Sequence, residues 1–397
     1  MTNVALGTLF NFIRNGLNVK QDKSGNGLPI TRIETISDGT IDRGRVGYAG
    51  LREEDANGWL LEEGDILLSH INSVAHIGKC AIYRGEPSQL IHGMNLLCFR
   101  SDRSKLDPEF AKYLLRSAQF RSHLSNCIKE AVNQASVSIG DMQAIPVSVP
   151  PLPEQRRIAA ILDKADELRA KRRAAIAKFD SLTRSIFLDM FGDPVTNSKG
   201  WSVAPLGTFL RDVTNGMTRR RAVSDQGQSI VLRLRDIREG WIDFSDVNRI
   251  TLTADEAKKY QVLEDDLLFI RVNGNPDYVG RCALFRGYIE NVYFNDHVMR
   301  VRVDGKVVHG VFLASLLNSA HGKREIAKHR KTSAGQHTIN QDGLSRIKLL
   351  HPPLHMQQHF ANVITAIGSW KKTHEISLLA SDRLFASLQH RAFRGEL

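Results

Sequence analysis

The feature that most constrains this chain of 397 residues is an internal duplication. Segments of the first half recur in the second half, in the same order and always 200–202 residues later. Five segments pair in this way: ALGTLFNFIRNGLN (5–18) with PLGTFLRDVTNGMT (205–218), ITRIETISDGTID (30–42) with VLRLRDIREGWID (231–243), EGDILLSHIN (63–72) with EDDLLFIRVN (264–273), HIGKCAIYRG (76–85) with YVGRCALFRG (278–287), and PEFAKYLLRS (108–117) with GVFLASLLNS (310–319). Shared composition does not produce five matches at one offset, so the sequence predicts two copies of one fold.

Each copy ends in a proline cluster followed by a long helical pattern, VPPLPEQRRIAAILDKADEL (149–168) and HPPLHMQQHFANVITAIGSW (351–370). Apolar residues then recur at steps of three and four, as in a coiled coil. A helix of about 36 residues is roughly 54 Å long, too long to lie against one small domain. We therefore expect the two helices to pair antiparallel, and the alternative is two independent helices, each on its own domain. The pairing residues are predicted to be Ile158, Ile161, Leu168, Phe179, Leu182, Ile186, Phe360, Val363, Ile367, Trp370, Leu384 and Leu388.

The globular part of each copy has the pattern of an α/β (α+β) domain. The runs that start at Asp65 and Asp266 predict short buried strands, and those at Lys79 and Arg281 predict strands that return after a turn. Asp107 followed by proline predicts a helix start. The expected architecture is therefore a tandem duplication with pseudo-two-fold symmetry, in which two long antiparallel helices separate the domains. The predicted segments are residues 1–151, 152–195, 196–351 and 352–397.

Charge is distributed unevenly between the two copies. Residues 1–150 contain 16 Lys and Arg against 16 Asp and Glu, whereas residues 196–351 contain 24 against 17. A basic surplus in one globular region favours a polyanionic partner, with a solvated basic surface as the alternative. The four cysteines form no CxxC pair, and no apolar run is long enough to span a membrane, so a cytoplasmic protein without a metal site is expected.

Three stretches resemble the conserved regions of the specificity (S) subunit of type I restriction–modification enzymes: PPLPEQRRIAAILDKADEL (150–168), KRRAAIAKFDSLTRSIFLDMFGDP (171–194) and AFRGEL (392–397). The resemblance covers the whole chain as target domain, helix, target domain, helix. It is weaker at the second helix start, where His355, Met356 and Gln358 replace Pro153, Glu154 and Arg156.

The resemblance implies a subunit without catalytic activity of its own. Each target recognition domain reads one half of a split site in double-stranded DNA, and the helices set the spacing between the halves. Two adenine-N6 methyltransferase (M) subunits dock along the helices, and motor-nuclease (R) subunits join them. S-adenosylmethionine and ATP are then cofactors of the partner subunits and not of this chain.

Two other functions remain as alternatives. Asn275-Pro-Asp-Tyr resembles the Asn-Pro-Pro-Tyr motif of adenine methyltransferases, but Asp277 replaces the second proline and no glycine-rich nucleotide loop follows a strand upstream. No P-loop is present, which disfavours ATPase chemistry. The second alternative is a two-headed scaffold that holds partner proteins without reading DNA.

DNA contacts are expected from polar residues at matching places in the two copies. Arg and Lys bind guanine edges and Asn and Gln bind adenine edges in the major groove, while Arg219-Arg-Arg221 has the charge for phosphate contact. For a single residue, a solvated loop side chain is as good an interpretation. Because the first domain is neutral, we expect weak, salt-sensitive binding by the isolated chain. The candidates are His70, Asn72, His76, Lys79, Asn133, Gln134, Ser136, Arg219, Arg220, Arg221, Arg271, Asn273, Asn275, Tyr278, Arg281, Thr332, Ser333, Gln336 and His337.

Overall fold

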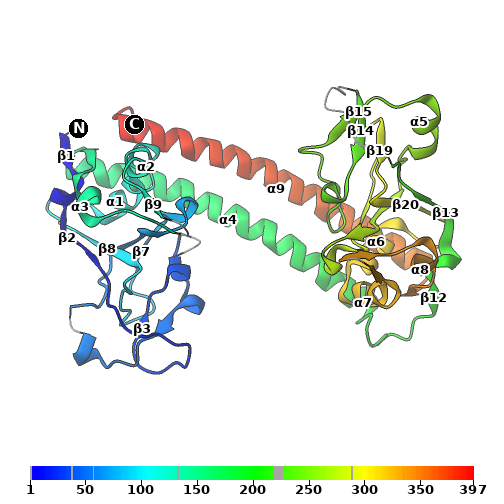
Figure 1. The fold of residues 1–397 in the computed structure, drawn as a ribbon, viewed down its shortest axis with the longest axis horizontal. Helices are drawn as coiled ribbons and strands as arrows, with labels where there is room; N and C mark the ends of the chain where they lie inside the picture. The colour runs from blue at the N-terminus through cyan, green and yellow to red at the C-terminus, as the bar shows by residue number, and fades with distance from the viewer. Residues whose placement is uncertain are drawn as a thin grey trace. The chain divides into compact units, whose positions relative to one another are not determined.

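A computed structural model describes residues 2–36, 39–56, 58–131, 134–218, 227–287, 289–333 and 335–397. The chain divides into two compact units, whose elements are labelled in Figure 1. Unit 1 comprises residues 1–174 and 374–397, and unit 2 comprises residues 175–373. Both divisions fall inside a long helix, so each unit contains one globular domain and one half of each long helix.

Unit 1 is organised around a four-stranded antiparallel sheet in the order β2-β8-β5-β7. The predicted strands after Asp65 and Lys79 are confirmed as β5 and β7. The sheet strands are β2 (Phe10–Asn15), β5 (Ile66–Ser69), β7 (Cys80–Ile82) and β8 (Leu96–Ser101). The smaller sheets pair β1 (Thr2–Ala5) with β11 (Pro146–Val149), β3 (Pro29–Ile30) with β4 (Gly47–Tyr48), and β10 (Gln134–Ser136) with both β6 (Ile71–Asn72) and β9 (Lys129–Ala131).

The helices of unit 1 are α1 (Pro108–Leu114), α2 (Ala118–Ser125) and α3 (Ile139–Ala144), which Figure 1 labels. Helix α1 contacts the long helix α4 (Leu152–Phe191), because Lys112 Nζ lies 2.6 Å from Asp163 Oδ1. The predicted helix start at Asp107 is confirmed. Its carboxylate accepts hydrogen bonds from the backbone N–H groups of Glu109 (3.0 Å) and Phe110 (3.2 Å). These two donors would otherwise have no partner at the helix terminus.

Unit 2 repeats this order of elements, which confirms the duplication at the level of the fold. Its main sheet runs β13-β20-β16-β18. The strands of this sheet are β13 (Leu210–Asn215), β16 (Leu267–Ile270), β18 (Cys282–Leu284) and β20 (Val298–Val303). The repeated small elements are β12 (Val203–Pro205), β17 (Val272–Asn273), β21 (Lys331–Ser333), β22 (Gln336–Thr338), β23 (Lys348–Leu350), α6 (Gly310–Asn318), α7 (Ala320–His329) and α8 (Gln341–Ser345).

One region differs between the copies. Where unit 1 has the short β3–β4 pair, unit 2 has a three-stranded sheet in the order β15-β14-β19, with β14 and β19 parallel. These strands are β14 (Ser229–Leu232), β15 (Asn248–Ile250) and β19 (Val292–Phe294), and helix α5 (Ala254–Tyr260) precedes β16. The duplication therefore preserves the main sheet and the elements next to the long helices.

The long helices are α4 (Leu152–Phe191) and α9 (Leu354–Arg394), and they pair antiparallel in each unit. In unit 1, Arg169 Nε donates to Asp382 Oδ1 at 2.6 Å, and Arg157 contacts Leu397. In unit 2, Lys371 Nζ lies 2.6 Å from Asp180 Oδ1. The two ion pairs join equivalent positions, because Arg169 and Asp180 become Lys371 and Asp382 when 202 is added.

Four residues that were predicted to pair the long helices do not lie in the seam between them. The structure exposes Leu168 (50%), Leu182, Trp370 (60%) and Leu384, and it partly buries the side chains one residue later. Arg169, Thr183, Lys371 and Phe385 occupy those later positions, and three of these residues are polar. The aliphatic stems of Arg and Lys pack in the seam while their charged ends form ion pairs. A search for apolar residues therefore selects the wrong face at these steps.

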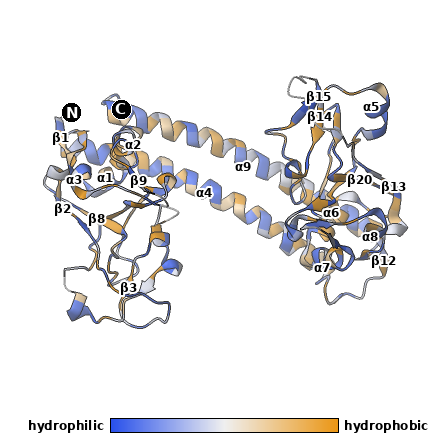
Figure 2. Cartoon of the chain, viewed as in Figure 1, coloured by the Kyte–Doolittle hydropathy of each residue, from blue (hydrophilic) through white to orange (hydrophobic). Residues whose placement is uncertain are grey.

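The remaining predicted pairing residues lie in the seam or at its edge. Ile158, Phe360 and Ile367 are buried, and Ile161, Phe179, Ile186, Val363 and Leu388 are partly buried. In unit 2 the rings of Phe187 and Phe191 lie 5.6 and 5.4 Å from that of Phe360. Figure 2 shows hydrophilic and hydrophobic residues alternating along both helices. Within the described residues, no helix combines the length and apolar character needed to cross a bilayer.

Candidate nucleic-acid interface

In unit 1 the two groups of predicted contact residues come together in one small sheet. Strand β6, directly after the buried strand β5, pairs with β10, so that Asn72 faces Ala135 and Ile71 faces Ser136. Strand β10 also pairs with β9. Residues predicted to lie in separate loops thus form short strands, because pairing over more than sixty residues supplies their hydrogen bonds. Gln134 is exposed and Ser136 is partly exposed on the middle strand.

Unit 2 has the same arrangement at equivalent positions. Asn273 of β17 faces His337 of β22, and β22 pairs with β21 in a hairpin. Thr332 and His337 are opposite one another in this hairpin, with the Thr332 hydroxyl 2.8 Å from His337 Nδ1. Thr332, Ser333 and Gln336 are exposed. A two-stranded ribbon of this kind fits the major groove of B-DNA, where amide and hydroxyl groups meet base edges.

The predicted asparagines have structural roles in the turns that follow β6 and β17. The Asn72 carboxamide oxygen accepts from the N–H of Ser73 at 2.8 Å. The Asn273 oxygen accepts from Asn275 N–H (2.8 Å), and the Asn275 oxygen accepts from Asp277 N–H (3.0 Å) at the start of the 3-10 turn η8 (Pro276–Tyr278). The matching turn in unit 1 is η5 (Val74–His76), in which His76 is exposed. The methyltransferase-like motif is therefore a capped turn in this structure.

Several predicted cations are held by the protein itself. The Arg281 guanidinium lies 4.2 Å from the centre of the exposed Tyr278 ring and 3.7 Å from Glu239. Arg271 donates to the Asp296 carbonyl at 2.9 Å. Lys79 is partly buried and has an interaction within the protein. Arg281 thus packs on Tyr278, whose ring is exposed to solvent.

His70 is buried, with only 4% of its surface exposed, so we leave it out of the proposed contact set. Burial lowers the pKa of its imidazole to about 4, because a charged ring loses its hydration there. His70 therefore remains neutral at ordinary pH. Asn133 and Arg219, Arg220 and Arg221 lie outside the described residues.

Sequence reasoning missed two lysines on the outer strands of these sheets. Lys129 on β9 and Lys331 on β21 are exposed and lie 202 residues apart, at equivalent positions. Lys129 lies 3.3 Å from Asp141. The 202-residue offset of the duplication could have identified them, because it pairs Lys129 with Lys331. Arg330 was also missed: it donates to the Pro276 carbonyl at 2.7 Å and so fastens the hairpin to η8.

Residues 1–178 match the family model described as the type I restriction modification DNA specificity domain. The chain is 40% identical over 201 residues to the MjaX type I restriction enzyme specificity subunit of Methanocaldococcus jannaschii, covering 50% of this chain and 47% of that one. It is 25% identical over 385 residues to the StySPI specificity subunit of Salmonella potsdam, covering 93% of this chain and 82% of that one. Over these stretches the chain is similar to type I restriction specificity subunits.

The match to the EcoKI specificity subunit of Escherichia coli is 30% identical over 190 residues and covers 41% of that protein. The chain therefore spans about half the length of two of these three specificity subunits and most of the third. Solved structures show the same specificity-subunit fold. The S subunit from M. genitalium gives a TM-score of 0.62 at 12% identity, covering 99% of this chain and 96% of that one.

A second solved structure gives a TM-score of 0.53 at 17% identity. It is described as the structural basis of complex assembly and conformational transition of the type I R-M system. This likeness covers 100% of this chain and 98% of that one. The predicted fold, a tandem duplication joined by long helices, is confirmed by both structures.

Proposed function

We propose that this chain is the DNA sequence-specificity subunit of a type I restriction–modification system. Each globular domain reads one half of a bipartite site in double-stranded DNA, and the paired helices hold the two readers at a set spacing. The observation that carries the proposal is the small sheet present in both units. In each unit it gathers exposed polar side chains from distant parts of the chain into a ribbon of suitable size for the major groove.

The chain has no catalytic role in this proposal. Within the described residues, no group of three or more His, Cys, Asp or Glu is placed to hold a metal ion. Asn275 uses its carboxamide oxygen to cap η8, which supports a structural role for the Asn-Pro-Asp-Tyr motif. Adenine methylation with S-adenosylmethionine and ATP-driven steps are assigned to methyltransferase and motor-nuclease partner subunits.

The exposed apolar residues of the long helices support docking of protein partners. Unit 1 exposes Leu168, Ile376, Leu379 and Leu384, and unit 2 exposes Leu182, Leu188 and Trp370. Leu168 and Trp370 are equivalent positions, as are Leu182 and Leu384. Clustered apolar side chains on a helix surface are typical of a protein interface. We assign this surface to two methyltransferase subunits, one on each half of the molecule.

The test is co-expression with the methyltransferase subunit followed by sequencing of methylated adenines. The expected result is a split motif, in which exchange of residues 1–150 for those of a relative changes one half and exchange of residues 196–351 changes the other. A methylation pattern that neither exchange alters would favour the scaffold alternative. Methyl transfer by this chain alone would favour the enzyme alternative.

A further inference from the structure

Unit 2 contains a cavity of about 750 Å³ between α6, the turn at Gly240 and Trp241, and the unit 2 halves of the long helices. This volume lies within the range of ligand sites, roughly 300–1,000 Å³. Its floor is apolar and is formed by Phe187, Leu284, Val311, Ala314, Phe360 and Ile364.

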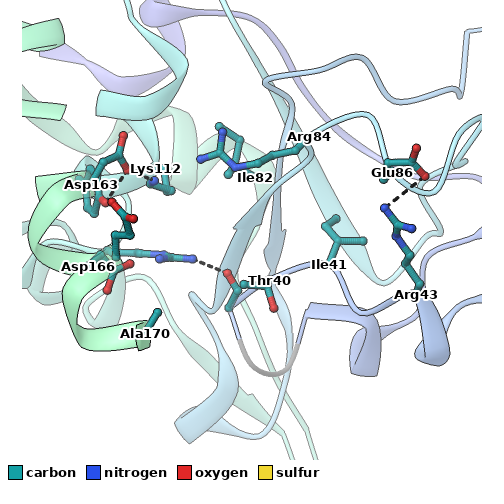
Figure 3. A pocket seen from close by; sticks show the side chains of 14 residues that line it. Thr40, Ile41, Arg43, Ile82, Arg84, Glu86, Lys112, Asp163, Asp166 and Ala170 are labelled. Carbon is teal, nitrogen blue, oxygen red and sulfur yellow. Dashed lines mark hydrogen bonds and ion pairs between the residues drawn. The ribbon is translucent and has the colours of Figure 1, made fainter. Parts of the chain in front are cut away.

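The equivalent place in unit 1 is occupied in part by charged side chains, and Figure 3 shows Lys112, Asp163 and Arg84 of this group. Lys112 Nζ lies 2.9 Å from Glu109 and 2.6 Å from Asp163 on α4. The Tyr113 hydroxyl donates to Asp163 at 2.7 Å. The cavity that remains in unit 1 is smaller, about 420 Å³, and is lined mainly by charged groups.

Substitutions between the copies explain why the cavity opens in unit 2. Adding 202 to Glu109, Lys112 and Tyr113 gives Val311, Ala314 and Ser315. Two large polar side chains become small ones and a carboxylate becomes an isopropyl group. Volume and charge are lost together, which leaves an open apolar space in unit 2 where unit 1 has ion pairs around the buried Lys112.

The same substitutions release an arginine at the mouth of the cavity. In unit 1, Arg84 forms a two-point ion pair with Glu109, at 2.6 and 2.9 Å. The equivalent Arg286 lines the cavity together with Val311, which replaces the glutamate, and it has no ion-pair partner within the described residues. Arg184, which also lines the cavity, likewise has none there. Two acids of the lining form ion pairs, since Asp180 binds Lys371 and Glu239 binds Lys323, each at 2.6 Å. The third, Asp193, accepts a hydrogen bond from the Val195 N–H at 2.9 Å.

The rim exposes three apolar side chains. Trp241 is 55% exposed, and Leu188 and Val195 are also exposed. Leu188 lies on α4, six residues after the exposed Leu182. An apolar floor with two unpaired arginines and an apolar rim is complementary to an apolar or aromatic side chain flanked by carboxylates. The continuity with the helix surface favours a polypeptide segment over an isolated small molecule.

We propose that this cavity of unit 2 binds an acidic segment of the methyltransferase subunit, anchored by a large apolar side chain. The inference rests on the proposed function and goes beyond it by naming a pocket that only one of the two methyltransferase subunits occupies. Arg286 and Arg184 pair with the carboxylates of the segment, and Trp241 covers the anchor. The second methyltransferase copy meets the charged side chains of unit 1 and binds without such an anchor.

The experiment compares assembly of full-length variants with the methyltransferase subunit by native mass spectrometry across a concentration series. Ser315→Tyr fills the cavity with the residue that unit 1 carries at the equivalent position, so we expect it to fold. Arg286→Glu reverses the charge at the mouth. Each variant should weaken binding of one methyltransferase copy by roughly tenfold or more, as loss of an interface anchor does, so that 1:1 complexes accumulate. Arg121→Glu, on the exposed surface of α2, is the charge-matched control and should assemble like the parent chain.

Equal assembly of Ser315→Tyr, Arg286→Glu and the parent chain would overturn the proposal, provided that circular dichroism shows the variants folded. Weakening by Arg121→Glu to the same extent would also overturn it, since a general charge effect would then suffice. If the parent chain bound no methyltransferase subunit, the proposed function itself would fail. Weakening of both copies alike would contradict the pocket while leaving the function intact.

Discussion

At the scale of single residues, the duplication identifies matched side chains whose roles differ with their surroundings. Gln336 on β22 and Gln134 on β10 are both exposed on the middle strand of a small sheet. His70 lies one residue before β6 and is buried, although its sequence position made it a candidate for DNA contact. Composition and spacing predicted where polar residues cluster. They did not predict which side chains face solvent, because burial depends on strands that pair across the fold.

Gln336→Ala should alter recognition of one half-site only. Loss of a carboxamide that contacts a base reduces discrimination at that position by about 1–3 kcal/mol. The other half-site should be unchanged, since unit 1 is untouched. Sequencing of methylated adenines after co-expression measures both halves at once. Gln134→Ala is the matched variant and should relax the opposite half, so a pair of variants that affect the same half would contradict the assignment.

His70 should make the free energy of unfolding depend on pH. Its pKa falls from about 6.5 in the unfolded chain to about 4 in the folded one, so the unfolded state binds the proton first as pH decreases. The contribution is complete above pH 6.5 and is lost progressively toward pH 4, by up to about 3 kcal/mol. His70→Phe should reduce the difference in urea unfolding free energy between pH 7 and pH 4.5.

Some of that difference should remain in the His70→Phe variant, because burial also lowers the pKa of His92 and His309. His76→Phe is the control, since the His76 ring is exposed to water in the folded protein. An unchanged pH dependence in His70→Phe would show that His70 carries no proton-linked stability.

At the scale of elements, the sequence predicted two paired helices and their antiparallel direction but shifted part of the seam by one residue. Apolar periodicity selected Leu168, whereas the structure buries Leu162 completely and places Arg169 in the seam. Polar residues with long stems occupy seam positions that an apolar search excludes. The small sheets were missed for a different reason, since strands of two or three residues have no periodicity and exist only through their partners.

Leu162→Ala and Leu168→Ala should therefore differ sharply. Leu162 is buried in the core of unit 1, and its truncation should lower the free energy of unfolding by about 2–5 kcal/mol. Leu168 is exposed, and its truncation should change stability by less than about 0.5 kcal/mol while weakening binding of the methyltransferase subunit. Urea unfolding and native mass spectrometry measure the two effects. Equal destabilisation by both variants would indicate that Leu168 is buried between the helices, as the sequence predicted.

At the scale of the whole molecule, unit 1 is discontinuous in sequence. Residues 374–397 contribute Ala392 and Phe393 to its buried core, where the Phe393 ring lies 5.4 Å from that of Phe110. Phe385 lies 6.0 Å from Tyr113. Unit 2 is continuous, from residue 175 to residue 373. The repeat indicated two equal copies, but it did not indicate that the second helix completes the core of the first copy.

Removal of residues 374–397 should destabilise unit 1 more than unit 2. Without Phe385, Ala392 and Phe393, apolar surface of α1 and α4 becomes exposed to water. Limited proteolysis with mass spectrometry should show early cleavage within residues 1–174 and slower cleavage within residues 175–373. Phe393→Ala should have an intermediate effect, about 3–5 kcal/mol on unfolding. Unaltered protection of unit 1 in the truncated chain would contradict this dependence.

The discontinuity of unit 1 also affects synthesis on the ribosome. Residues 1–174 emerge first, yet the segment that completes their core is translated only after all of unit 2. At about 5–20 residues per second, the roughly two hundred intervening residues impose a delay of 10 s or more. During this interval the nascent first domain has an incomplete core, so a prematurely terminated polypeptide lacks a finished first domain, and translation must pass through unit 2 before unit 1 reaches its native state.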